Sequence, residues 1–123
     1  MICTMSSKRL SPAAIEMVAT RFRILGEPLR IRLLQEMREG EKSVSELVAA
    51  VGSTQPNVSK HLRILQEAGF IARRQEGNLV YCRIEDPTVF ELCNVVCTTL
   101  GEQLSTTAKM AAELSRGMTP RKR

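Results

Sequence analysis

Residues 53–65 have the sequence STQPNVSKHLRIL, which predicts one helix with two different faces. At the helical period, the apolar face consists of Val58, Leu62 and Leu65. The outer face carries Asn57, Lys60 and Arg63, with Pro56 and His61 nearby. A helix of this kind can bury its apolar stripe while its hydrogen-bonding face enters the major groove of DNA. The pattern therefore predicts a DNA recognition helix.

A shorter helix is predicted just before the recognition helix. Residues 43–46, SVSE, form a capping-box pattern that opens a helix running through Ala50. Gly52 then allows a tight turn, after which Ser53 or Thr54 can cap the recognition helix. Two helices around such a turn indicate a helix-turn-helix. An ordinary amphipathic helix pair in an all-α core is the alternative, because the two share this pattern.

A β-hairpin is predicted after the recognition helix. Gly69 is placed to end that helix, and the hairpin strands follow at residues 70–75 and 79–84, with a turn at residues 76–78. Alternation in the second strand puts Val80, Cys82 and Ile84 on one face and Leu79, Tyr81 and Arg83 on the other. The first strand ends in Arg73, Arg74 and Gln75, which are placed to reach phosphates or the minor groove. The alternative is a solvated charged hairpin.

Both ends of the chain are predicted to be helical. Helices are expected over residues 12–25 and 29–38, separated by a Gly-Glu-Pro break. Asp86 and Pro87 have the types found at an N-cap and a first helical position, and they open a helix to about Ser115. Its apolar stripe contains Val89, Cys93, Val96, Leu100, Leu104 and Ala111. The predicted fold is mainly α with a β-hairpin wing, in the order α-α-α-α-β-β-α.

The last helix predicts a partner, because a domain of this size cannot cover so long an apolar stripe alone. We expect a homodimer formed by the N-terminal and C-terminal helices, which presents two recognition helices to a pseudo-palindromic site. A monomer whose terminal helices fold back is the competing arrangement. The expected organisation is a flexible N-terminus at residues 1–11, one winged-helix and dimerisation domain at residues 12–115, and a basic tail at residues 116–123.

Composition favours a polyanionic partner. The 123 residues include 18 Lys and Arg against 13 Asp and Glu, which gives a net charge of +5. Only 3% of residues are aromatic, so double-stranded DNA fits better than stacked single strands. No secretory signal or membrane span is visible, and we expect a cytoplasmic protein with reduced cysteines. An enzyme is not expected, since the chain has one histidine and no phosphate-binding loop or paired-carboxylate motif.

Several stretches in uninterrupted order resemble the ArsR/SmtB winged-helix repressors. The resemblance rests on LGEPLRIRLL at 25–34, SEL at 45–47, QPNVSKHL at 55–62, LQEAG at 65–69 and GNLVY at 77–81, and it extends over roughly residues 15–100. It implies a homodimer that represses its operon and releases DNA when an inducer binds. It also implies a buried hydrogen-bonding role or a phosphate contact for Arg30.

The recognition helix and the wing together define a predicted DNA-binding set. Its members are Gln55, Pro56, Asn57, Ser59, Lys60, His61, Arg63, Arg73, Arg74, Gln75 and Asn78. The resemblance implies major-groove contacts for Gln55, Pro56, Ser59, Lys60 and His61, and it places Arg73, Arg74, Gln75 and Asn78 in the wing.

The sensor sites of the family do not transfer to this chain. The helix before the recognition helix contains no cysteine, the helix at residues 29–38 contains none, and the only histidine is His61. What the chain offers instead is Cys93 and Cys97, four residues apart on the last helix, with Cys3 and Cys82 as weaker candidates. Two thiolates at that spacing can hold trivalent arsenic or another thiophilic ion.

Four other interpretations of the cysteines and of the fold stay open. Oxidation or persulfidation of the thiols is a second mode of sensing, although the Cα atoms of an i,i+4 pair are about 6 Å apart, near the limit for a disulfide. Cys93 and Cys97 can also be plain packing residues in a DNA-binding regulator that senses nothing through cysteine. A thiol-based metal carrier and a nucleoid protein are the remaining alternatives.

Overall fold

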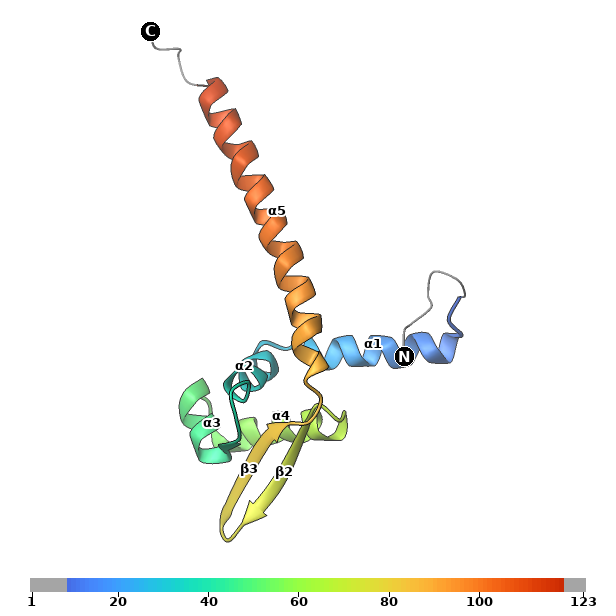
Figure 1. The fold of residues 1–123 in the computed structure, drawn as a ribbon, viewed down its shortest axis with the longest axis vertical. Coiled ribbons are helices and arrows are strands. Elements are labelled where there is room, and N and C mark those ends of the chain that lie inside the picture. Colours follow the sequence, from blue (N-terminus) through green and yellow to red (C-terminus); the bar gives the residue numbers. More distant parts are fainter. Residues whose placement is uncertain (1–8, 119–123) are drawn as a thin grey trace. The chain divides into compact units, whose positions relative to one another are not determined.

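The computed structural model describes residues 9–118, with the side chains described up to residue 116. The chain divides into two compact units, Met1–Asp86 and Pro87–Arg123. Cys3 and residues 119–123 of the basic tail lie outside the described residues. The first unit contains α1 (Pro12–Leu25), α2 (Pro28–Glu36), β1 (Lys42–Ser43), α3 (Val44–Val51), α4 (Gln55–Glu67), β2 (Ile71–Glu76) and β3 (Leu79–Ile84) (Figure 1). The second contains α5 (Thr88–Met118).

The sheet has three strands rather than the two predicted. Its order is β1-β3-β2 and both pairings are antiparallel, so the short β1 is an edge strand. Lys42 lies opposite Cys82 and Ser43 opposite Tyr81. Strand β1 could not be predicted from the sequence, because two residues carry no alternation and only the pairing with β3 makes them a strand. This pairing joins the wing to the start of α3.

A single apolar core holds the helix-turn-helix and the sheet together. Its most buried side chains are Leu33, Leu34, Met37, Leu47, Val58, Leu62, Leu65, Phe70, Ile71 and Cys82. The predicted stripe of α4 is confirmed, since Val58, Leu62 and Leu65 are each 0% exposed. Removing these side chains from water is the main force that fixes α4 against α2 and α3.

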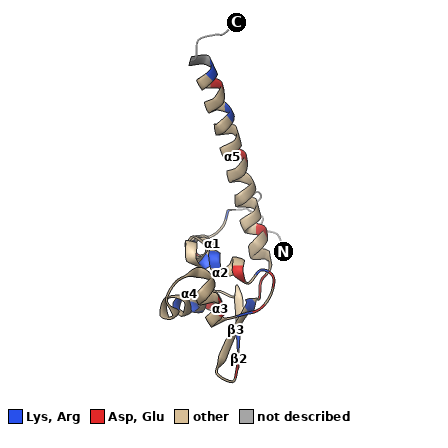
Figure 2. Ribbon diagram, turned by 90° about the vertical axis from the view of Figure 1, so that its left-hand side faces the viewer, with Lys and Arg blue, Asp and Glu red and all other residues tan. Residues whose placement is uncertain are grey.

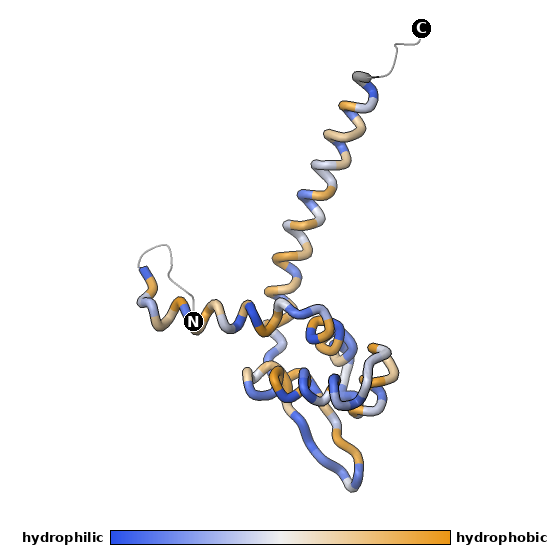
Figure 3. Tube along the Cα trace, turned by 180° about the vertical axis from the view of Figure 1, so that it is seen from behind, coloured by the Kyte–Doolittle hydropathy of each residue, from blue (hydrophilic) through white to orange (hydrophobic). Residues whose placement is uncertain are grey.

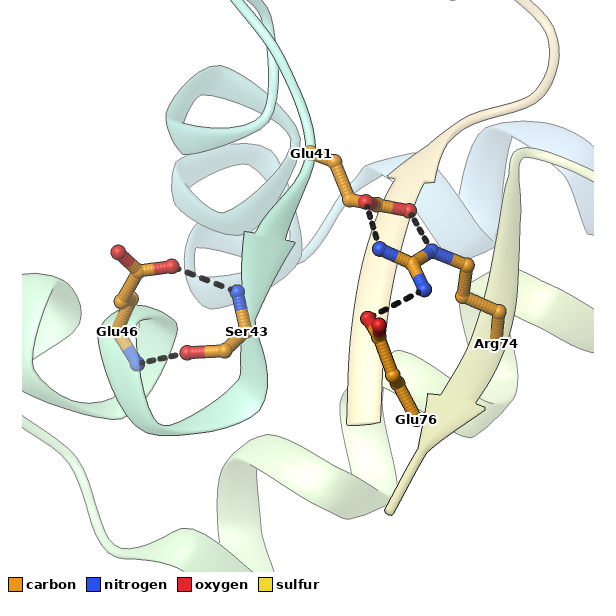
Figure 4. A network of polar contacts seen from close by, with 5 residues as sticks. All are labelled: Glu41, Ser43, Glu46, Arg74 and Glu76. Atoms are coloured by element: carbon orange, nitrogen blue, oxygen red, sulfur yellow. Dashed lines mark hydrogen bonds and ion pairs between the residues drawn. The ribbon is translucent and has the colours of Figure 1, made fainter. Parts of the chain in front are cut away.

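Local signals set the ends of the two central helices as predicted. The capping box is present: Ser43 Oγ accepts from the backbone N–H of Glu46 at 3.1 Å, and Glu46 Oε1 accepts from that of Ser43 at 2.8 Å (Figure 4). Gly52 ends α3 with φ of 66°, a left-handed conformation that glycine adopts without strain. Thr54 is the N-cap of α4. These short-range contacts create the tight turn between α3 and α4.

The hairpin and α5 match their predictions with small shifts. Glu76 belongs to β2, so the connecting turn is Gly77 and Asn78, with Gly77 at φ 62°. The last helix begins at Thr88, after Pro87, and continues to Met118. Apolar residues recur along its whole length (Figure 3), and charged residues are few (Figure 2). None of the helices in the described part of the chain has the length and apolar character needed to cross a membrane.

Candidate nucleic-acid interface

Helix α4 has a free polar face on the side opposite its core stripe. Five side chains of the predicted DNA-binding set are exposed there: Gln55, Pro56, Asn57, Lys60 and Arg63. They are free to meet another molecule because the buried stripe anchors the helix from the other side. The exposed face contains amide and cationic groups, which are the groups that bind base edges and phosphates.

Side-chain hydrogen bonds hold the first turn of α4 in place. Thr54 Oγ1 accepts a hydrogen bond from the backbone N–H of Asn57 at 3.3 Å, and Pro56 has no N–H to leave unsatisfied. The side-chain amide of Asn57 donates to Ser53 Oγ at 2.9 Å. The first helical turn therefore has a defined geometry, and the positive end of the helix dipole lies at the exposed end of the polar face.

A small concavity brings α3, α4 and the wing together. It has a volume of about 110 Å³. Four residues of the predicted DNA-binding set line it: Gln55 and Ser59 from α4, Arg73 from β2 and Asn78 from the turn of the wing. Ser43 and Ser45, at the start of α3, line the same hollow and were not predicted as site residues. Residues from 43 to 78 thus converge on one polar surface that contains a single arginine.

His61 does not lie on this surface, which corrects the sequence prediction. Its side chain is 8% exposed, and Nδ1 lies 3.0 Å from Nη1 of Arg30 in α2. Arg30 is also held by the carbonyl oxygen of Ile24, to which its Nε donates at 2.6 Å. His61 precedes Leu62 and follows Val58 by three positions, so it lies at the edge of the apolar stripe, where α2 covers it. Arg30 therefore has a hydrogen-bonding role inside the protein, which is one of the two roles expected for it, the other being a phosphate contact.

Burial also changes the acid–base behaviour of His61. Removal from solvent is the largest effect and lowers the pKa of the imidazole. The carboxylate of Glu27 acts in the opposite direction, and the positive charges of Arg30 and Lys60 add to the lowering. Since an arginine can only donate, Nδ1 of His61 must accept, which requires a ring with no proton on that atom.

Arg74, the second arginine of the wing, is bonded within the protein. Its Nε and Nη2 donate to Glu41 at 2.9 and 2.8 Å, and its Nη1 donates to Glu76 at 2.9 Å (Figure 4). The guanidinium also lies over the ring of Tyr81, 4.5 Å from the centroid. Gln75, by contrast, makes only a local bond to the carbonyl oxygen of Gly77 at 3.2 Å. The pairing of Arg74 with Glu41 could not be predicted from the sequence, because the two residues are 33 positions apart.

The described cysteines differ in accessibility. Cys82 is fully buried, and burial raises the pKa of its thiol, so it behaves as a packing residue. Cys93 is half-buried and Cys97 is exposed, both on α5, and all three thiols are free. Within residues 9–118 no three side chains of His, Cys, Asp or Glu gather into a metal site.

Relatives identify the class of this fold. Residues 27–73 match the family described as "Bacterial regulatory protein, arsR family". The uncharacterized HTH-type transcriptional regulator Rv0081 of Mycobacterium tuberculosis is 35% identical over 97 residues, which are 78% of this chain and 85% of that protein. The chain belongs to the ArsR family. Its fold is therefore a winged helix-turn-helix, as predicted.

Solved structures agree with the family assignment. The crystal structure of Rv0081 superimposes on this ArsR-family chain with a TM-score of 0.72 at 34% identity, covering 80% of this chain and 99% of the other. The homodimeric winged helix-turn-helix DNA-binding domain of Mb0332 from Mycobacterium bovis, a possible ArsR-family regulator, gives 0.67 at 27% identity, covering 80% and 94%. A probable mercury resistance operon repressor of Streptomyces lividans is 38% identical over 71 residues. That match spans 58% of this chain and 57% of the relative.

Proposed function

We propose that this chain is a homodimeric, sequence-specific DNA-binding repressor. The observation that carries the proposal is the convergence of Gln55, Ser59, Arg73 and Asn78 on one concavity, beside the exposed polar face of α4. In this arrangement α4 enters the major groove and the wing follows the adjacent backbone. The net charge of +5 supplies the sequence-independent attraction to DNA.

The apolar surface of α5 supports a second copy as the partner. Positions repeating every seven residues form a charge-free seam along the helix. One set is Cys93, Leu100, Thr107 and Leu114, and the other is Phe90, Cys97, Leu104 and Ala111. All five charged residues from 88 to 116 lie outside this seam: Glu91, Glu102, Lys109, Glu113 and Arg116. Such a pattern is typical of helices that pack against another helix. The homodimeric domain of Mb0332 supports the same assembly.

Helix α1 carries further apolar surface that a second copy can cover. Ile15, Met17 and Phe22 are 52%, 72% and 62% exposed within the subunit. Burying them together with the α5 seam gives a two-fold dimer that uses both terminal helices. Its two recognition helices would meet successive major grooves, with half-sites about 34 Å apart in a pseudo-palindromic operator.

Fluorescence anisotropy of the reduced protein on the DNA upstream of its own gene tests this function. At physiological salt we expect tight binding to that DNA and much weaker binding to a shuffled duplex of equal length and composition. Equal binding to both duplexes would instead identify a nucleoid protein. Binding to neither would overturn the proposal, and soft-metal binding in its place would identify a metal carrier.

For the inducer, we propose a thiol-reactive agent acting at Cys93 and Cys97, with trivalent arsenic or another thiophilic ion as the leading candidate. Both cysteines lie on the charge-free seam, half-buried and exposed within one subunit. A two-fold partner packed on that seam brings its own pair close, so four thiols become available to one or two soft ions. The similarity to the probable mercury resistance operon repressor of Streptomyces lividans supports a soft metal. Binding there would reset the angle between the two winged units and release the operator.

Release of the operator by arsenite tests the sensing site. The double variant Cys93→Ser with Cys97→Ser is expected to bind the operator as the wild type does and to resist arsenite. Cys82→Ala is the matched control, because it removes a thiol and leaves the pair on α5 in place. If arsenite still releases the double variant fully from the operator, both cysteines are packing residues and not the sensing site. If arsenite leaves the wild type bound, the same assay extends to other thiophilic metals, persulfides and oxidants.

A further inference from the structure

The guanidinium of Arg74 has three partner residues, which come from three parts of the first unit. Glu41, in the loop before β1, receives two parallel bonds of 2.9 and 2.8 Å. Glu76 receives a third at 2.9 Å from the same strand as Arg74, and Tyr81 of β3 lies under the guanidinium plane. A bidentate pair between arginine and carboxylate is directional, unlike a contact between two point charges. Arg74 is therefore held in one orientation (Figure 4).

This cluster carries no surplus positive charge for DNA. The two carboxylates and one guanidinium sum to −1, since −1 − 1 + 1 = −1. Arg73, one position earlier, lines the concavity with Gln55 and Asn78. The neighbouring arginines of the wing thus have different environments, one facing the candidate DNA surface and one paired within the protein.

The position of Glu41 links the wing to the helix-turn-helix. Glu41 directly precedes β1, in which Ser43 pairs with Tyr81, the cross-strand neighbour of Arg74. Ser43 is also the N-cap of α3. The bond from Arg74 to Glu41 consequently runs from β2, past β3, to the residue before β1, and it ends three residues before the first residue of α3. It limits how far the hairpin can swing from α3 and α4.

We propose that Glu41 and Arg74 are a positioning pair that holds the wing at the angle needed for specific DNA binding. This inference rests on the proposed function. Glu41 then promotes operator binding despite its negative charge, and Arg74 acts through Glu41 and not through a phosphate. The pair stays ionised in mildly acidic solution, because the hydrogen bonds from Arg74 lower the pKa of Glu41.

Substitution of Glu41 distinguishes two explanations of its role, because they predict opposite changes in DNA affinity. If the carboxylate only repels DNA, Glu41→Gln should tighten binding to every duplex. If it positions the wing, Glu41→Gln should weaken operator binding roughly threefold to fivefold, as expected for loss of a well-formed surface ion pair. Glu85→Gln is the matched control. It removes the same charge just after β3, where the carboxylate pairs with Arg83 at 3.4 Å and not with Arg74.

Arg74→Lys gives a second, independent measurement. A lysine keeps the positive charge but cannot make the two parallel bonds to Glu41. We expect a similar weakening with an unchanged salt dependence, and the double variant with Glu41→Gln should be no weaker than either single variant. Additive losses, or a reduced salt slope in Arg74→Lys, would show that Arg74 contacts DNA by itself and would overturn the inference.

The experiment combines operator anisotropy with hydrogen exchange of the DNA-free dimer. We expect faster exchange of the β2 and β3 amides in Glu41→Gln than in Glu85→Gln, together with weaker operator binding. Unchanged exchange, or tighter binding, overturns the positioning role while the wild type still recognises its operator. If the wild type does not distinguish operator from shuffled DNA, the proposed function is wrong, and the positioning role that rests on it is wrong as well.

Discussion

Arg30 of α2 donates a hydrogen bond from Nη1 to Nδ1 of His61 in α4 across 3.0 Å. The Nε atom of the same arginine donates to the carbonyl oxygen of Ile24, and the Glu27 carboxylate receives the backbone N–H groups of Leu29 and Arg30. One polar chain therefore runs from the α1–α2 junction to the recognition helix. It fixes the inner side of α4, while the outer side stays free for DNA.

This contact predicts a stability that depends on pH. The folded-state pKa of His61 is lowered below its ordinary value of 6.5, chiefly by burial, so the unfolded chain takes up a proton more readily. Stability from the neutral ring is fully present above pH 6.5 and is lost as the pH falls through the lower folded-state pKa. Denaturant melts of the wild type at closely spaced pH values should show this decline.

His61→Asn is the control for that titration. An asparagine oxygen can accept from Arg30 near the place of Nδ1, and it does not titrate. We expect a less stable protein overall, with a flatter pH profile just below 6.5. An equally steep decline in the variant would assign the effect to other groups.

Lys60→Ala should weaken operator binding and leave the fold intact. The side chain is exposed on the polar face of α4, so its loss removes a cation from the DNA surface without disturbing the core. The slope of log affinity against log salt should fall by about 0.9 for one lost phosphate contact. Lys109→Ala, on the charged side of α5, is the matched control and should bind normally. Unchanged binding by Lys60→Ala would count against α4 as the recognition helix.

Leu104→Glu should shift the protein from dimer to monomer. The leucine is 69% exposed within one subunit and lies on the α5 seam, where a partner would enclose the new charge. Burying an unpaired carboxylate is costly, so dimer affinity should fall roughly tenfold or more. Sedimentation velocity measures the change. Glu102→Lys, outside the seam, should stay dimeric, and a dimeric Leu104→Glu would exclude this face as the interface.

Gly52→Ala should destabilise the helix-turn-helix by about 1 kcal/mol, the cost of a left-handed conformation for an L residue. Gly52 has φ of 66° and no atom within 4 Å of an added Cβ, so strain and not a clash is the cause. Gly52→Asn is the comparison, because asparagine tolerates this region better. Thermal or chemical unfolding should rank the wild type above Asn and Asn above Ala.

The elements of this protein were predictable because their signals are short-range. The capping box at Ser43, the cap at Thr54 and the stripe through Val58, Leu62 and Leu65 each depend on residues a few positions apart. The wing followed from alternation and a Gly-containing turn. From these local rules alone, the sequence specified a winged helix-turn-helix with an exposed polar face on α4.

Tertiary structure decided the features that depend on distant pairs. The bond between Arg30 and His61 spans 31 residues, and that between Arg74 and Glu41 spans 33. Local periodicity gives the direction of a side chain but not the neighbour that covers it, so it could not reveal the pairing of His61 with Arg30 or of Arg74 with Glu41. Strand β1 likewise exists only through β3. The sequence by itself determined which face of each element is apolar and which is polar. Only the tertiary structure decided which polar side chains stay unpaired and exposed, because burial and pairing depend on contacts between elements.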